Sequence, residues 1–118
     1  MINKQDYINS INQNIEMVRG DTLSFNFIIS GAEGTPTFTF AVADEYGDSP
    51  VITSTSGDGI ELEETEGDNN LYSVTIRPSQ TSGLNTGLYY YNLVMYLDGE
   101  VYTLMRGEFN ILYEVKRG

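Results

Sequence analysis

Six carboxylates crowd into one short stretch of the chain, GDGIELEETEGDNN, and hard cations such as calcium bind clusters of carboxylate oxygens. They are Asp58, Glu61, Glu63, Glu64, Glu66 and Asp68. Their spacing does not fit the twelve-residue loop of an EF-hand. Ile60 and Leu62 alternate with glutamates, which favours a strand whose glutamates face solvent. We interpret the cluster as a solvated acidic face that binds no metal, with calcium binding and contact with a basic partner as the alternatives.

The composition removes the usual catalytic groups. The 118 residues contain no histidine and no cysteine, which excludes Ser-His-Asp and Cys-His constellations, disulfides and thiolate metal sites. Asp44, Glu45 and Asp48 lie in the turn-rich stretch DEYGDSP, where acids are ordinary turn formers. Neither a nucleophile–base pair nor a glycine-rich phosphate loop can be recognised. We therefore predict that the protein is not an enzyme and uses no cofactor.

Charge limits the classes of partner. Seventeen acids against six bases give a formal net charge of −11, which opposes binding to nucleic acid or to an anionic membrane. No apolar run approaches the roughly 20 residues of a membrane span. The N-terminal MINKQDYINS has no apolar stretch of the signal-peptide type. We expect a soluble protein made in a cytoplasm, with a small-molecule ligand unlikely and other proteins as its partners.

Tyrosines dominate the last part of the chain, in the run LYYYNLVMY and again at Tyr102. Because side chains alternate along a strand, Tyr89 and Tyr91 fall on one face, and Tyr90 falls on the other together with Val94 and Tyr96. The first face continues with leucine and methionine, so we assign Tyr89 and Tyr91 to the core, with hydroxyls that reach backbone groups.

The outward stripe of Tyr90, Val94 and Tyr96 is more apolar than contact with solvent requires. We predict that it packs against another protein chain. Ordinary cross-strand pairing and a platform for sugar or peptide are the alternatives. Ile8 and Ile11, in the N-terminal segment, are added to the predicted protein interface.

These residues must be positioned by strands, since the chain reads as short alternating segments separated by turn formers. The predicted strands are 15–19, 22–30, 37–43, 51–56, 60–64, 71–78, 88–97 and 100–112. We expect 51–56 to be an edge. Asp98-Gly99 indicates a hairpin turn, and Gly107 indicates a bulge or a close backbone approach. The predicted fold is all-β: a single antiparallel, immunoglobulin-like β-sandwich of about seven or eight strands, with a small barrel as the alternative.

The N-terminal segment lies outside this pattern. Ile8, Ile11 and Ile15 have helical spacing, so residues 1–14 are predicted to form either a short amphipathic helix or a loose arm. Residues 15–118 are predicted to form the β-sandwich domain.

Two longer stretches carry a resemblance to a known family. They are VRGDTLSFNFII and GIELEE…NLYSVTIRPSQTSGLNTGLYYYNLVMYLDGEVYTLMRGEFNIL. In order and spacing they resemble the small immunoglobulin-like domain of tailed-phage structural modules, which forms the N-terminal part of baseplate upper proteins. Gly87, Tyr89, Tyr91 and Leu93 hold places of the family's Gly-x-Tyr-x-Tyr-Asp-Leu strand, and Asn92 stands where Asp is common. The resemblance covers about four fifths of the chain.

The resemblance implies a structural or assembly protein of a phage or prophage particle, in the baseplate, the neck or against the capsid. It implies location in the virion after synthesis in the host bacterial cytoplasm, with other virion proteins and a second copy as partners. Because the family's receptor-binding domain does not follow residue 118, direct receptor binding is not expected. Arg19-Gly20-Asp21 is expected to be a turn between strands, not an integrin motif. A carbohydrate-binding or adhesion sandwich with calcium-dependent loops is the alternative function.

Overall fold

The structure, a computed structural model, describes residues 11–31 and 34–116 of the chain. These residues form nine strands and one helical turn. The elements are β1 (Ile11–Asn12), β2 (Ile15–Val18), β3 (Leu23–Ser30), β4 (Thr37–Ala43), β5 (Ile52–Ser56), β6 (Gly59–Glu66), β7 (Asn69–Ile76), α2 (Pro78–Thr81), β8 (Gly87–Leu97) and β9 (Glu100–Leu112).

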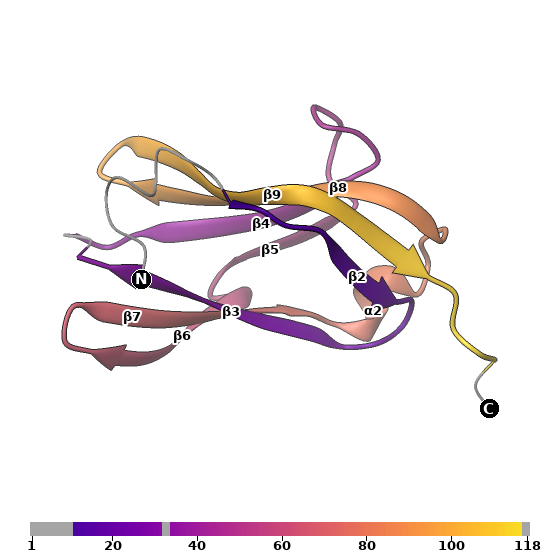
Figure 1. The fold of residues 1–118 in the computed structure, drawn as a ribbon, viewed down its shortest axis with the longest axis horizontal. Coiled ribbons are helices and arrows are strands. Elements are labelled where there is room, and N and C mark those ends of the chain that lie inside the picture. Colours follow the sequence, from indigo (N-terminus) through magenta and orange to yellow (C-terminus); the bar gives the residue numbers. More distant parts are fainter. Residues whose placement is uncertain (1–10, 32–33, 117–118) are drawn as a thin grey trace.

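The strands form two packed layers (Figure 1). One layer contains β9, β8, β4 and β5, with β1 and β2 along the far side of β9, and the other contains β6, β7 and β3. This architecture confirms the predicted all-β, immunoglobulin-like sandwich. It includes parallel pairings of β1 and β2 with β9 and of β5 with β6. The prediction that residues 51–56 form an edge is wrong, because β5 pairs with β4 in one layer and with β6 in the other.

The core lies between the layers and is built by the predicted alternation. Along β4, Phe38, Phe40 and Val42 are buried, while the residues between them are more exposed. Rings from the two layers meet edge to face: the centroids of Phe27 and Phe38 are 5.0 Å apart. Such pairs add to the free energy gained by burying the rings. The apolar period of two therefore decides which side of each layer faces inward.

The N-terminal segment begins the sandwich earlier than predicted. Ile11 and Ile15 lie on β1 and β2, which run parallel to β9 with Ile11 opposite Met105 and Ile15 opposite Phe109. The helical interpretation of the isoleucine spacing is therefore wrong at Ile11. Ile8 lies outside the described residues.

At Gly107 the backbone of the N-terminal segment lies very close to β9. A Cβ at this position would collide with the backbone carbonyl of Gln13. The Gln13 amide donates to the carbonyl oxygen of Arg106 at 3.0 Å, and the Glu108 amide donates to Asn14 Oδ1 at 3.1 Å. The close backbone approach predicted for Gly107 is confirmed. The register shift of the β8–β9 ladder falls elsewhere, opposite Leu93 and Val94.

The β8–β9 hairpin turns as predicted at Asp98-Gly99. Both residues have positive φ, 50° and 80°, as a two-residue type I′ turn requires. This turn fixes the register of the β8–β9 ladder from Leu97 back to Val94, where the register shifts.

Candidate protein-binding face

The candidate site is the outer face, by which we mean the side of the β9–β8–β4–β5 layer that points away from the core. Each outward residue of β8 lies beside its cross-strand partners on β4 and β9, so the three residues form a row across the face. The outer face consists of Leu88, Tyr90, Asn92, Val94 and Tyr96 on β8, Thr37, Thr39, Ala41 and Ala43 on β4, Thr53 and Thr55 on β5, and Val101, Thr103, Arg106, Glu108 and Asn110 on β9.

Charge is divided unequally between the two layers. The strand residues of the outer face include one positive and one negative side chain, Arg106 and Glu108, so their formal charges cancel within a chain of −11. On β6, in the other layer, Glu61, Glu63, Glu64 and Glu66 are all exposed. The predicted solvated acidic face is therefore found on β6, while the strand residues of the outer face have no net charge. The loop between β4 and β5 adds Glu45 and Asp48 beside them.

The three strand residues predicted as an interface all lie on the outer face. Tyr96 is 43 % exposed and sits beside Val101, which is 62 % exposed. Val94 lies between two threonines and is half-buried, as is Tyr90. Ile11, also predicted for the interface, lies in β1 at the edge of the same layer. The structure thus brings Tyr90, Val94 and Tyr96 together in one stripe.

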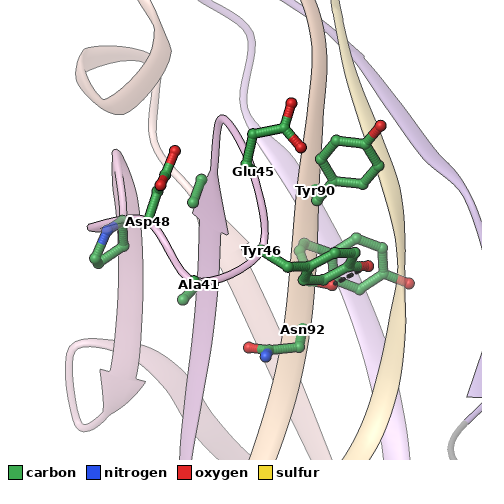
Figure 2. Close-up of a pocket in the computed structure, with 10 residues that line it drawn as sticks. Ala41, Glu45, Tyr46, Asp48, Tyr90 and Asn92 are labelled. Atoms are coloured by element: carbon green, nitrogen blue, oxygen red, sulfur yellow. Dashed lines mark hydrogen bonds between the residues drawn. The ribbon is translucent and has the colours of Figure 1, made fainter.

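Tyr46 is a residue of this face that the sequence analysis missed. It comes from the loop between β4 and β5, and its ring lies over the outer face with its centroid 5.1 Å from that of Tyr90 (Figure 2). Its hydroxyl donates to the carbonyl oxygens of Gly107 at 3.1 Å and Tyr91 at 3.4 Å. The guanidinium of Arg106 stands 4.4 Å from the Tyr46 ring centroid, within cation–π range. An aromatic residue in the otherwise polar DEYGDSP stretch was the signal that could have found it.

A small cavity opens where the Tyr46 loop meets β8. It has a volume of about 90 Å³. Its lining includes the rings of Tyr46 and Tyr90 and the side chains of Glu45, Asp48 and Asn92 (Figure 2). Small-molecule pockets commonly measure about 300–1,000 Å³. The cavity is therefore suited to a single side chain of a partner protein rather than to a cofactor or a sugar chain.

Tyr89 and Tyr91 are core residues, as predicted. The Tyr89 hydroxyl donates to the Asn85 carbonyl at 2.7 Å, and the Tyr91 hydroxyl donates to the Gln13 carbonyl at 2.6 Å. Burial, with a smaller contribution from the neighbouring Tyr46, raises the pKa of Tyr91 to about 12. Tyr91 thus ties the N-terminal segment to the underside of the same strand that carries Tyr90.

Alkaline pH is expected to weaken the fold through Tyr91. Its folded-state pKa of about 12 lies above the ordinary value, so the unfolded chain loses this proton first. The contribution of Tyr91 to the unfolding free energy is therefore fully present below about pH 10. It is lost as pH rises toward 12, and the loss is at most about 2–3 kcal/mol. Chemical denaturation at several pH values measures the slope.

Tyr91→Phe is the matched variant for the alkaline experiment. It should cost about 1 kcal/mol at neutral pH, from the lost hydrogen bond to Gln13, and should flatten the alkaline decline. Tyr72 and Tyr89, whose pKa values burial also raises, keep part of the slope. Equal slopes for the wild type and Tyr91→Phe would show that Tyr91 does not control the decline.

The Arg19-Gly20-Asp21 stretch is a turn between β2 and β3, as expected. Gly20 has a φ of 82°, and the Asp21 amide donates to the Val18 carbonyl at 3.1 Å. The Arg19 guanidinium is only partly exposed and binds the Glu114 carboxylate at 3.0 Å. The structure therefore uses Arg19 to join the first strands to the C-terminal segment.

The described part of the chain contains neither a metal-binding cluster nor a membrane-spanning helix. Residues 11–31 and 34–116 hold no group of three or more acidic side chains arranged around a common cation position. Glu63 of the acidic strand instead accepts a hydrogen bond from the Ser73 hydroxyl at 2.8 Å. Among the same residues, no helix has the length and apolar character needed to cross a membrane.

The chain matches no protein-family model and no curated protein. Solved structures share its fold. A family 123 glycoside hydrolase from Clostridium perfringens is similar with a TM-score of 0.55 and 16 % identity, over 96 % of this chain and 26 % of the hydrolase. The chain thus spans about a quarter of that enzyme. At this identity the likeness shows the fold alone.

Two further solved structures are less similar. The CupB6 tip adhesin from Pseudomonas aeruginosa gives a TM-score of 0.43 at 17 % identity, over 89 % of this chain and 40 % of the adhesin. A voltage-gated sodium channel β subunit, studied for multimeric cell-adhesive interactions, gives a TM-score of 0.42 at 15 % identity, over 89 % of this chain and 93 % of that chain.

Proposed function

We propose that the chain is a non-enzymatic assembly module that acts by protein–protein contact through the outer face. The observation that carries this proposal is a set of outward strand residues without net charge, including exposed tyrosine and valine, on a chain of net charge −11. An acidic protein meets the least electrostatic repulsion from another acidic chain over such a face.

The chemistry of the outer face fits an interface. Tyrosine and arginine are enriched where binding energy concentrates, and Tyr46, Tyr90 and Arg106 are stacked together in the middle of the face. The surrounding threonines and alanines are uncharged, so covering them costs less desolvation energy than covering charged side chains would. Exposed Val101 and Tyr96 add apolar area that water does not favour.

The size of the outer face also fits. The molecule measures 47 × 29 × 20 Å, and Figure 1 shows both layers edge-on with their strands along the longest axis. In the β9–β8–β4–β5 layer, β8 has 11 residues and β9 has 13, so these strands are about 35–45 Å long, and four neighbouring strands about 4.8 Å apart span about 15–20 Å. Stable interfaces bury about 800 Å² per partner, which a face of these dimensions can supply.

The setting we propose is a tailed-phage or prophage particle, in which the chain is a virion component of the baseplate, the neck or the capsid surface. This setting rests on the resemblance of the VRGDTLSFNFII and TGLYYYNLVMYLDGE stretches to the phage immunoglobulin-like domain. The partners would then be other virion proteins and a second copy of the chain.

The double variant Tyr90→Ser, Tyr96→Ser tests the proposed function. The chain is co-expressed with the products of the genes on either side and analysed by size exclusion with light scattering. The wild type is expected to elute as a defined oligomer or complex, and the variant is expected to lose association at least tenfold while remaining folded. The stripe supplies the apolar contact area that the variant removes.

Ile28→Ser, Leu62→Ser is the matched control, since both residues are exposed apolar side chains, 40 % and 54 %, of the other layer. It is expected to associate like the wild type. A wild-type chain that stays monomeric and binds neither neighbouring product would overturn the proposed function. If only the control variant loses association, the contact lies on the other layer and not on the outer face.

A further inference from the structure

Arg106 differs from the other arginines that the structure describes. Arg19 pairs with Glu114 at 3.0 Å and Arg77 pairs with Asp58 at 3.4 Å. Arg106 forms no ion pair within residues 11–31 and 34–116, although the chain has seventeen acids. It is exposed in the middle of the outer face.

The stack on Tyr46 prepares Arg106 to bind a carboxylate. The ring 4.4 Å from the guanidinium carbon restrains the side chain, and the Tyr46 hydroxyl is itself held by the Gly107 and Tyr91 carbonyls. An arginine stacked on an aromatic ring keeps its N–H donors at the edge of the guanidinium plane, where they can meet a carboxylate in bidentate fashion. The structure thus presents a pre-organised cation to whatever covers the outer face.

Glu108 supplies the complementary group on the same face. It lies two positions along β9, so its side chain points to the same side as Arg106, about 7 Å farther along the strand. If two copies meet with their β9 strands antiparallel around a two-fold axis near Gly107, Arg106 of each copy lies opposite Glu108 of the other. The dimer then contains two equivalent ion pairs, one on each side of the axis, as an isologous interface requires.

From this arrangement we infer that the outer face binds a second copy of the chain, as a two-fold dimer with reciprocal Arg106–Glu108 ion pairs around the Tyr46–Tyr90 stack. The inference rests on the proposed function and names the partner. Charge complementarity favours a second copy, because Arg106 and Glu108 of one copy match Glu108 and Arg106 of the other. A strongly basic partner would be attracted more to the exposed glutamates of β6.

A charge exchange tests the dimer. Sedimentation equilibrium of the full chain, from about 5 μM to about 1 mM, gives the dimer Kd. Arg106→Glu and Glu108→Arg each place like charges opposite one another, and each is expected to weaken the dimer about tenfold or more. The double variant Arg106→Glu, Glu108→Arg restores opposite charges and is expected to return within about threefold of the wild type.

Two controls carry the same changes of charge on other parts of the molecule. Arg77→Glu and Glu64→Arg are expected to leave the Kd within about threefold of the wild type. Circular dichroism and the melting temperature establish that each variant is folded. Glu108→Arg leaves the Arg106–Tyr46 stack in place, so it tests the pairing even if Arg106→Glu disturbs the loop.

The possible results separate the inference from the proposed function. A monomeric wild type at about 1 mM overturns the inference, and the proposed function survives if a neighbouring gene product still binds the outer face. A dimer that neither single variant weakens, or that the double variant does not restore, overturns the reciprocal pairing. A dimer lost in both single variants and regained in the double supports it.

Discussion

Replacing Gly107 with alanine is expected to displace the N-terminal strands and to lower the unfolding free energy by about 2–3 kcal/mol. The new methyl group would occupy the space of the Gln13 carbonyl. Three hydrogen bonds lie at this approach: from the Tyr91 hydroxyl to the Gln13 carbonyl, from the Gln13 amide to the Arg106 carbonyl, and from the Glu108 amide to Asn14. The contact is between two backbones, so no side chain can rotate away to relieve it.

Hydrogen exchange with mass spectrometry measures this effect, since amides of residues 11–18 should lose protection in Gly107→Ala. Gly83→Ala is the control, because a Cβ at Gly83 meets nothing within 4 Å. It should be neutral or slightly stabilising, as it reduces the freedom of the unfolded chain. If residues 11–18 keep wild-type protection in Gly107→Ala, the close backbone approach at Gly107 does not hold the N-terminal strands in place.

Phe40→Ala is expected to cost about 3–5 kcal/mol, the usual range for truncating a fully buried phenylalanine. Phe40 has no exposed surface. Its ring centroid lies 5.6 Å from that of Phe25 in the opposite layer and 5.4 Å from that of Tyr91 in its own. Removing it leaves a cavity that both layers line, and the melting temperature should fall by about 10 °C or more.

Thr39→Ala isolates the effect of burial, since Thr39 precedes Phe40 and points to the outer face. Its expected cost is below about 1 kcal/mol. Urea denaturation of both variants gives the comparison. If the two substitutions cost the same, the division of β4 into an inner and an outer face would be wrong.

Alternation along single strands was predictable because it depends only on neighbouring residues. The inward positions of Phe38, Phe40 and Val42 follow directly from it, and so does the separation of Tyr91 from Tyr90. The hairpin at Asp98-Gly99 was predictable for a similar reason, since its backbone conformation is a local preference.

Contacts between distant segments were not predictable from these local patterns. Ile11 and Ile15 have helical spacing, yet pairing with residues of β9, more than ninety positions away, makes them strand residues. The placement of Tyr46 is of the same kind, since only the folded chain brings its loop over Tyr90. The pairing of β5 with strands of both layers also depends on the whole topology.

We propose that the outer face is where this chain meets another protein chain. The most direct measurement is a nuclear magnetic resonance map of amide shifts on self-association, and on addition of a neighbouring gene product if the chain is monomeric. We expect the perturbed amide signals to cluster at Tyr90, Val94 and Tyr96 and at Arg106, with the signals of β6 unchanged. Perturbations confined to the β6–β7–β3 layer, or none in either experiment, would contradict it.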